Sequence, residues 1–249
     1  MIVYPNSKIN IGLNVLEKRA DGYHELSSVF YPVKDLCDIL EIIPSTEFSF
    51  SSSGIKIPGE GNICAKAFEM LKQDFEIGNV KIHLHKQIPI GAGLGGGSAD
   101  GAFMLKAMNL LFDLQLSTDQ LEKYALQLGA DCPFFIQNTP KYAQGVGENM
   151  SSLNLDLLAY KIQFIFPELH ISTAEAYREI TPKIPKTNLL NLINQPIENW
   201  KGKVKNDFEI SAFNKHPQLA KMKSQLYADG AIYASMSGSG SALYGLFNR

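Results

Sequence analysis

Hydrophobic and polar residues alternate along several segments of the chain, which predicts strands. In residues 80–85 the apolar side chains occupy every second position, the pattern of a strand with one buried face. Residues 2–16 show a similar alternation and predict one or two strands, with Lys8 and Asn10 on the same face. Further strands are expected in residues 29–43, in residues 160–166, and on both sides of a turn in residues 231–247.

Apolar residues at a spacing of three to four predict helices elsewhere in the chain. One helix is expected to start near Ser98. Asn62 and Ser117 are suited to cap two others, the second of which should run to about residue 128. Residues 48–58 are rich in serine and predict a hairpin at the edge of a sheet.

Composition narrows the class of protein. The chain has 249 residues, 45% of them hydrophobic and 19% charged, as in a globular protein of one large domain or two ordinary ones. A net charge of −2 gives no electrostatic reason to expect a nucleic-acid or membrane partner. Three dispersed cysteines are typical of reduced thiols, and no signal peptide or membrane span is expected, so the predicted location is cytoplasmic.

A glycine-rich segment lies between the strand at residues 80–85 and the helix that follows it. Six of the chain's 20 glycines fall between Gly91 and Gly101. Glycine lets the backbone approach a ligand closely, and the first turn of a helix offers N–H donors and the positive end of a dipole. Together these features predict a phosphate-binding loop, formed by Pro89, Gly91, Ala92, Gly93, Leu94, Gly95, Gly96, Gly97 and Ser98.

Two other types of phosphate loop fit this sequence less well. A Walker loop requires a lysine after its last glycine, and none follows here. Gly91, Gly93 and Gly96 satisfy the G-x-G-x-x-G dinucleotide pattern, with Asp113 or Asp119 roughly 20 residues further on. That match is weak because many loops share it and because Pro89 interrupts the end of the strand.

The longer string from Pro89 to Ser98 resembles the ATP-phosphate loop of the GHMP kinases. The opening segment, Lys8-Ile-Asn10 followed by Arg19-Ala-Asp-Gly-Tyr-His-Glu25, resembles the family of 4-diphosphocytidyl-2-C-methyl-D-erythritol kinases. Residues 129–135 are similar to the segment that carries the catalytic aspartate, and residues 238–241 to the third GHMP motif. One departure is Ala99, which stands where the family usually has a second serine.

This resemblance implies an α+β fold with two domains. The first would be a ribosomal-protein-S5-domain-2-like ATP-binding domain over residues 1–154. The second would be a ferredoxin-like GHMP kinase domain over residues 155–249. Strand and helix patterns agree with this fold but would also fit other mixed folds.

The resemblance also implies an activity, the transfer of phosphate from ATP to the 2-hydroxyl of 4-diphosphocytidyl-2-C-methyl-D-erythritol. This is a step of the non-mevalonate (methylerythritol phosphate) route to isoprenoid precursors. Asp131 would accept the hydroxyl proton, with Lys8 beside it neutralising charge. Mg²⁺ would accompany ATP with few protein ligands. Asn62 and Lys86 would lie at the nucleotide, although helix capping and plain solvation are the respective structural alternatives.

Recognition of the substrate would depend on two aromatic rings and a histidine. By resemblance, Tyr23 and Tyr177 would hold the cytosine base between them while His24 makes hydrogen bonds to it. The full set of expected substrate-binding residues is Asn10, Tyr23, His24, Thr173, Tyr177, Gly238 and Ser239. Partners would be small molecules only, and the protein a monomer or homodimer.

Two alternative functions remain open, and one pair of histidines could have a separate role. The chain could be another small-molecule GHMP kinase, against which the Tyr23-His24 turn argues. It could instead bind nucleotides, including NAD(H), without catalysis, against which Lys8 and Asp131 argue. His83 and His85 could hold a metal, but with no third ligand nearby in the sequence a solvated strand face is favoured.

Overall fold

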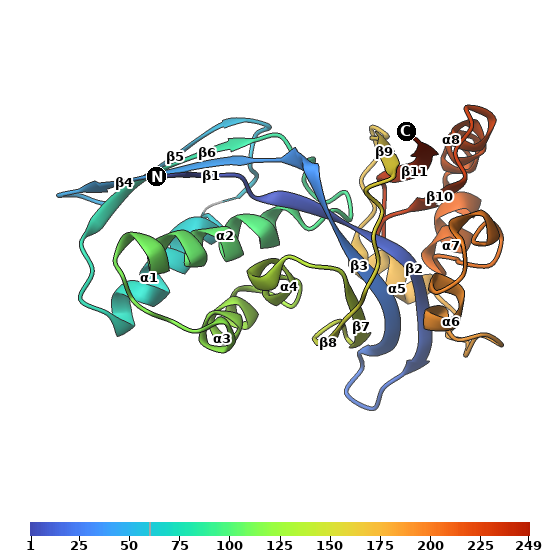
Figure 1. Cartoon of the computed structure of the whole chain (residues 1–249), viewed down its shortest axis with the longest axis horizontal. Coiled ribbons are helices and arrows are strands. Elements are labelled where there is room, and N and C mark those ends of the chain that lie inside the picture. The colour runs from blue at the N-terminus through green and yellow to red at the C-terminus, as the bar shows by residue number, and fades with distance from the viewer. Residues whose placement is uncertain (60) are drawn as a thin grey trace. The chain divides into compact units, whose positions relative to one another are not determined.

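The alternating residues before the glycine-rich segment form β6 (Asn79–Lys86) in the computed structural model, which describes residues 1–59 and 61–249. Val80, Ile82 and Leu84 are all buried, as the alternation predicts. Figure 1 shows the order of the helices and strands along the chain.

The chain forms two compact units, each assembled from separate segments. Unit 1 contains Met1–Lys8, Pro32–Ile90 and Gly95–Thr139. Unit 2 contains Ile9–Tyr31, Gly91–Leu94 and Pro140–Arg249. No single cut in the sequence produces these units, so the domain ranges 1–154 and 155–249 stay a prediction about family domains.

Unit 1 contains a four-stranded sheet in the order β1 (Ile2–Val3), β4 (Ile39–Ser45), β6 and β5 (Ser49–Gly54). β4 pairs with β6 in antiparallel register, Ile42 opposite Ile82. β5 lies at the edge, as expected, but runs parallel to β6. The predicted hairpin is therefore wrong: β6 occupies the place beside β4 that a hairpin would give to β5.

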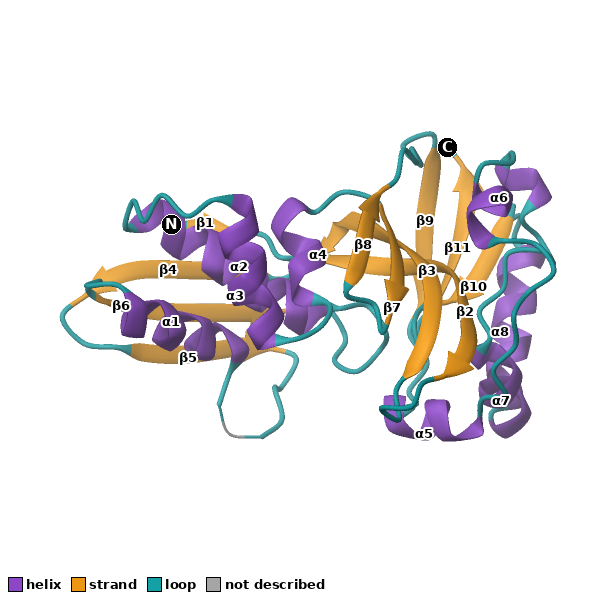
Figure 2. Ribbon diagram, turned by 90° about the horizontal axis from the view of Figure 1, so that it is seen from below, coloured by secondary structure: helices purple, strands orange, loops and turns teal. Residues whose placement is uncertain are grey.

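Helices α1 (Ile63–Asp74) and α2 (Gly96–Leu111) lie along one face of this sheet (Figure 2). The remaining helices of the unit are α3 (Thr118–Leu128) and α4 (Cys132–Gln137). Ser117 caps α3 in a capping box with Gln120, which confirms the predicted start. α2 begins at Gly96, two residues before the predicted start at Ser98.

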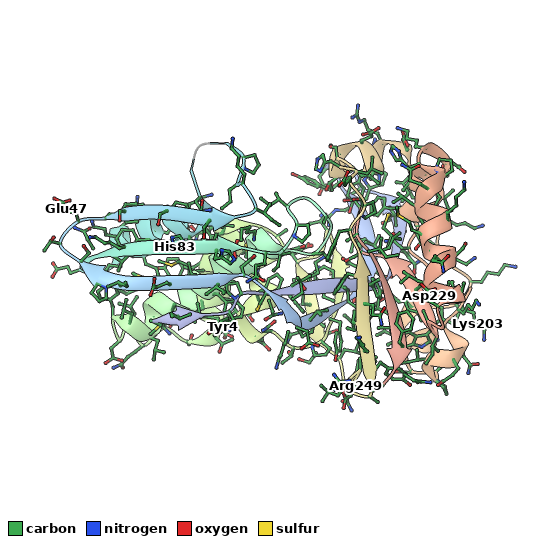
Figure 3. The ribbon with its side chains drawn as sticks, turned by 90° about the horizontal axis from the view of Figure 1, so that it is seen from above. Tyr4, Glu47, His83, Lys203, Asp229 and Arg249 are labelled. Carbon is green, nitrogen blue, oxygen red and sulfur yellow. The ribbon has the colours of Figure 1, made fainter. Side chains whose placement is uncertain are left out.

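The opposite face of the same sheet carries His83, which Figure 3 labels together with Glu47. Both ring nitrogens of His83 lie 2.9 Å from serine hydroxyls, those of Ser51 and Ser53, and His85 contacts Ser53 at the same distance. Among the described residues no group of three or more His, Cys, Asp or Glu could hold a metal ion. The two histidines therefore belong to a hydrogen-bonded strand surface.

A second four-stranded sheet has the order β2 (Asn6–Lys18), β3 (His24–Cys37), β7 (Lys141–Gly145) and β8 (Asn149–Ser152). β7 is the first strand after α2 in the described chain, and it belongs to a different sheet from β6. A dinucleotide-binding unit instead returns from its helix to a parallel strand of the same sheet. The alternative based on the G-x-G-x-x-G pattern is therefore wrong for this fold.

Unit 2 also contains a three-stranded sheet in the order β10 (Tyr233–Met236), β11 (Leu243–Asn248) and β9 (Tyr160–Ile165). Apolar residues of β10 and β11 share a core with Val15 of β2 and Phe208. The helices are α5 (Thr173–Glu179), α6 (Leu189–Ile193), the 3-10 turn η1 (Ile197–Asn199), α7 (Phe208–Lys215) and α8 (Pro217–Ala228). No helix in the described part of the chain has the length and apolar character needed to cross a membrane.

Candidate active site

The glycine-rich loop runs from Gly91 to Ser98, and its first half packs against the third motif within unit 2. Gly93 has φ of +78°, and a Cβ built on it would lie 2.0 Å from the carbonyl oxygen of Ser237. Only glycine fits this backbone conformation and this close approach. The Ser237 hydroxyl donates a hydrogen bond to the Gly93 carbonyl at 2.8 Å, which fixes the loop against residues 237–240.

The second half of the loop starts α2 within unit 1. Gly95 is the N-cap, with φ of +69°, and a Cβ there would lie 3.1 Å from Cγ of Lys8. The first helical hydrogen bond runs from the Ala99 N–H to the Gly95 carbonyl, so the amides of residues 96–98 precede the helical ladder. A Cβ on Gly97 would meet no atom within 4 Å. This helix start therefore offers backbone donors beside open space, as a phosphate group requires.

Lys8 and Asp131 form an ion pair, with 3.4 Å between Nζ and Oδ2. The Lys8 side chain is 5% exposed, whereas that of Asp131 is 35% exposed. Asp131 occupies the N-cap position of α4, but its side chain makes no capping hydrogen bond. The structure thus brings together the two residues predicted to be catalytic, and the alternative that Asp131 is a capping residue is wrong.

Asn10 lies in a buried hydrogen-bond network of unit 2. Its side-chain amide donates to the Ser28 hydroxyl at 2.8 Å, and Ser28 donates to the Gly12 carbonyl at 2.7 Å. The backbone N–H of Asn10 donates to the Ser237 hydroxyl at 3.2 Å. Ser237 therefore joins the segment that carries Asn10 to the Gly93 carbonyl of the loop.

Ser237 and Asn206 were not among the predicted site residues. Asn206 Oδ1 accepts the N–H of Phe208, the first residue of α7, at 3.0 Å, and its amide donates to the carbonyls of Met236 and Gly238, both at 2.8 Å. It therefore holds the third motif in place. An asparagine directly before a predicted helix start is the feature of the sequence that could have drawn attention to it.

The residues predicted to bind the base are partly brought together. The rings of His24 and Tyr177 are stacked, with centroids 5.0 Å apart and planes inclined by 26°. Tyr23 is 66% exposed, and its N–H donates to Asp21 Oδ1 at 3.0 Å. Tyr177 also meets Phe208 edge to face at 4.9 Å. His24 thus occupies one face of the Tyr177 ring, and the placement of cytosine between Tyr23 and Tyr177 stays a prediction.

Thr173 and Ser239 also lie together, with their hydroxyl oxygens 3.1 Å apart. Thr173 is the first residue of α5, and Ser239 follows Gly238 in the turn between β10 and β11. Both hydroxyls can donate and accept, so the pair presents polar atoms next to the third motif.

The two residues predicted to lie at the nucleotide, Asn62 and Lys86, have different roles in the structure. Asn62 Oδ1 accepts the N–H of Cys64 at 2.8 Å, which confirms that it caps α1. Lys86 is 4% exposed, and its ammonium lies between the carboxylates of Asp38 and Asp100. The expectation of a plainly solvated lysine is therefore wrong: two carboxylates from distant positions in the sequence compensate its charge inside unit 1.

Comparison with known proteins identifies relatives of this chain among the GHMP kinases. The models of the GHMP kinases N terminal domain and the GHMP kinases C terminal match residues 62–138 and 187–249. The 4-diphosphocytidyl-2-C-methyl-D-erythritol kinase of Bacteroides thetaiotaomicron is 51% identical over 99% of this chain and 92% of its own length. That of Azobacteroides pseudotrichonymphae is 47% identical over 100% and 94%.

Solved structures give the same assignment. A crystal structure of 4-(cytidine 5'-diphospho)-2C-methyl-D-erythritol kinase is 34% identical, with a TM-score of 0.85 over 99% of this chain and 90% of that one. A Methanococcus jannaschii mevalonate kinase, 17% identical with a TM-score of 0.69 over 100% and 90%, shares the fold. The two-domain α+β GHMP kinase fold expected from the motifs is confirmed. The chain belongs to the 4-diphosphocytidyl-2-C-methyl-D-erythritol kinase family of the GHMP kinases.

Proposed function

We propose that this protein transfers the γ-phosphoryl group of ATP to the 2-hydroxyl of 4-diphosphocytidyl-2-C-methyl-D-erythritol. The reaction would be a step of the methylerythritol phosphate route to isoprenoid precursors. The observation that carries the proposal is the Lys8–Asp131 pair, held at 3.4 Å in a chain whose relatives of 51% and 47% identity bear this kinase name.

Phosphoryl transfer depends on positioning and charge neutralisation more than on covalent chemistry by the protein. The backbone amides at the start of α2 would receive phosphate oxygens of ATP, where Gly97 borders open space. Packing against Phe135 and Lys8 leaves no room for a side chain at Gly95. The loop would therefore be positioned before the nucleotide arrives, which lowers the cost of ordering it on binding.

Asp131 is suited to receive the proton of the attacking hydroxyl because its carboxylate is partly exposed and is not used as a helix cap. Lys8 is buried beside it and supplies a fixed positive charge. That charge would orient the carboxylate and offset negative charge that develops during transfer. The proton would leave the 2-hydroxyl for an oxygen of Asp131 as the hydroxyl oxygen bonds to the γ-phosphorus. The bond between that phosphorus and the β,γ-bridging oxygen would break, with ADP as the leaving group.

Mg²⁺ would neutralise charge on the phosphates when it is bound with ATP. The described residues contain no group of three or more His, Cys, Asp or Glu that could form a protein cage for it. Mg²⁺ does not need such a cage, because it usually keeps several waters and takes substrate phosphates as ligands. We therefore expect the ion to enter with ATP, its ligands drawn mainly from phosphate oxygens and water.

The cytidine end of the substrate would be recognised at Tyr23, His24 and Tyr177. An aromatic face stacks on a pyrimidine base, and an imidazole can both donate and accept hydrogen bonds at the base's polar edge. Because His24 lies against Tyr177 without substrate, base binding at the Tyr177 face would require the imidazole to move. The partners of this protein would be small molecules, with oligomeric state left as monomer or homodimer.

The test is ATP consumption by the purified protein with Mg²⁺ and four candidate acceptors. These are the cytidylated substrate, the same polyol without its cytosine, mevalonate and homoserine. Turnover restricted to the cytidylated compound supports the proposal and its base pocket. Turnover with a different alcohol would retain a kinase and remove the pocket, and turnover with none would remove the proposed activity.

A further inference from the structure

Three charged side chains are buried together next to the glycine-rich loop in unit 1. The Lys86 ammonium lies 2.5 Å from Oδ2 of Asp38 and 2.6 Å from Oδ2 of Asp100. The side chains of Lys86, Asp38 and Asp100 are 4%, 0% and 2% exposed. The catalytic roles proposed above use none of these carboxylates, and the lysine is almost entirely buried.

Asp38 holds the backbone on the strand side of the loop. Its Oδ1 accepts two consecutive amides, those of Gln87 at 2.6 Å and Ile88 at 2.9 Å. These residues directly precede Pro89 and the first glycines. One carboxylate therefore fixes both the backbone and the Lys86 side chain where β6 ends.

Asp100 connects the same lysine to the helix side of the loop, since it lies in the second turn of α2. The start of α2 also packs closely against Ile88 and Lys86. A Cβ on Gly96 would lie 2.8 Å from Cγ2 of Ile88 and 3.1 Å from Nζ of Lys86. The chain is thus held on both sides of the loop by a single buried cation and its two carboxylates.

Stability alone does not account for such a cluster. Removing charged groups from water is costly, and a buried ion pair adds little stability over apolar side chains of the same volume. What the cluster adds is fixed geometry, because the Lys86 ammonium donates to Oδ2 of both aspartates and Asp38 Oδ1 accepts two backbone amides. Asp100 Oδ1, by contrast, is buried without a hydrogen-bond partner among the described residues. We infer that Asp38, Lys86 and Asp100 are positioning residues that set the loop for the phosphates of ATP, and that Lys86 acts through the two carboxylates.

Burial also shifts the titration of groups in and beside the cluster. Burial raises the pKa of Asp100 to about 8, with the charge of Asp38 adding to the effect and that of Lys86 opposing it. Cys64 of α1 also faces Asp100, donating to its carbonyl at 3.7 Å, and its own thiol pKa is raised well above normal by burial. The Asp100 carboxyl therefore keeps its proton to a higher pH than an exposed aspartate does.

This inference rests on the proposed use of ATP, and a binding measurement tests the two separately. The dissociation constant of Mg-ATP is measured by calorimetry without the alcohol substrate, at a temperature where each variant is folded by circular dichroism. Asp38→Asn and Asp100→Asn keep side-chain size, and neither residue is assigned a contact with ATP. We expect Asp38→Asn to weaken ATP binding at least about tenfold, a change of about 1.4 kcal/mol. Affinity for the alcohol substrate should stay unchanged.

A double-mutant cycle separates positioning by Lys86 from direct contact with the nucleotide. If Lys86 acts through Asp38, adding Asp38→Asn to Lys86→Met should weaken ATP binding by much less than Asp38→Asn does alone. If the fold-changes of the two single variants instead multiply in the double variant, Lys86 contacts the nucleotide independently of Asp38, and the inference is overturned. If Asp38→Asn does not fold, the same cycle is run with Asp100→Asn.

The matched control is Asp74→Asn, which removes an exposed carboxylate of α1 that accepts one hydrogen bond from Tyr124. It should bind ATP as the wild type does. Wild-type binding with unchanged affinity in both Asp38→Asn and Asp100→Asn would overturn the positioning role and leave the proposed function intact. No ATP binding by the wild type would overturn both.

Discussion

Asp131 opens helix α4 without capping it, and its carboxylate lies 3.4 Å from the Lys8 ammonium. The aspartate is partly exposed and the lysine is buried, so the pair combines a reachable oxygen with a fixed charge. A carboxylate that makes no helix-capping bond is free to serve a substrate hydroxyl.

The first prediction concerns this pair. Asp131→Asn preserves the shape of the side chain but removes a proton acceptor, so kcat should fall at least about a hundredfold. The KM for ATP should change little because the glycine-rich loop is untouched. Steady-state kinetics with the cytidylated substrate measure both constants, and Glu47→Gln, in the exposed bend between β4 and β5, serves as the control. Near-wild-type turnover in Asp131→Asn would remove its role as the base.

Two glycines of the loop should respond in opposite ways to alanine. Gly93→Ala would push a methyl group into the Ser237 carbonyl at a positive φ, so both the free energy of unfolding and ATP affinity should fall. Gly97→Ala meets no protein atom and replaces glycine within a helix, which should raise stability by up to about 1 kcal/mol.

The same Gly97 methyl would occupy the space proposed for phosphate, so ATP affinity should still decrease. Urea unfolding and calorimetric ATP binding measure the two properties separately for each variant. ATP affinity equal to that of the wild type in Gly97→Ala would place the phosphates elsewhere.

The stability of the protein should depend on the protonation of Asp100. The pKa of this carboxyl is about 8 in the folded protein, above its ordinary 3.8, so folding retains a proton that the unfolded chain releases. This contribution to stability is fully present below pH 3.8 and is lost as the pH rises to about 8. The free energy of unfolding of Asp100→Asn, relative to wild type, should therefore increase over that range.

Urea unfolding of the two proteins at about pH 5 and about pH 9 tests this dependence. Groups that do not interact with position 100 cancel in the difference, which leaves the Asp100 carboxyl and its coupling to Lys86 and Asp38. A difference that is the same at both pH values would show that Asp100 is not protonated in the folded state.

The stacked pair His24 and Tyr177 should govern use of the cytidylated substrate. Stacking of a base on an aromatic ring contributes about 1–3 kcal/mol, so Tyr177→Leu should raise the KM of that substrate about tenfold or more. ATP binding should be unaffected, and Tyr4→Leu, at a ring that is 58% exposed, provides the control. An unchanged KM in Tyr177→Leu would mean that the base binds away from this ring.

Local sequence patterns determined where several strands and helices form and which of their faces are buried. Alternation set the faces of β6, and side-chain oxygens at Asn62 and Ser117 set two helix starts. Clustered glycines predicted a phosphate loop, which stays a prediction. Each depends on neighbours within a few residues, which is why the sequence reveals it. The resemblance of its motifs to known kinases added the pairing of Lys8 with Asp131.

Tertiary structure decided the rest. The partners of Lys86 lie 48 and 14 residues away, and the contact of Ser237 with Gly93 spans 144 residues. Whether a lysine is solvated or buried, and whether β5 pairs with β4 or β6, depends on which distant segments meet. The periodicity of apolar residues along the sequence carries no information about such long-range contacts. Burial and charge compensation arise only once the chain has packed.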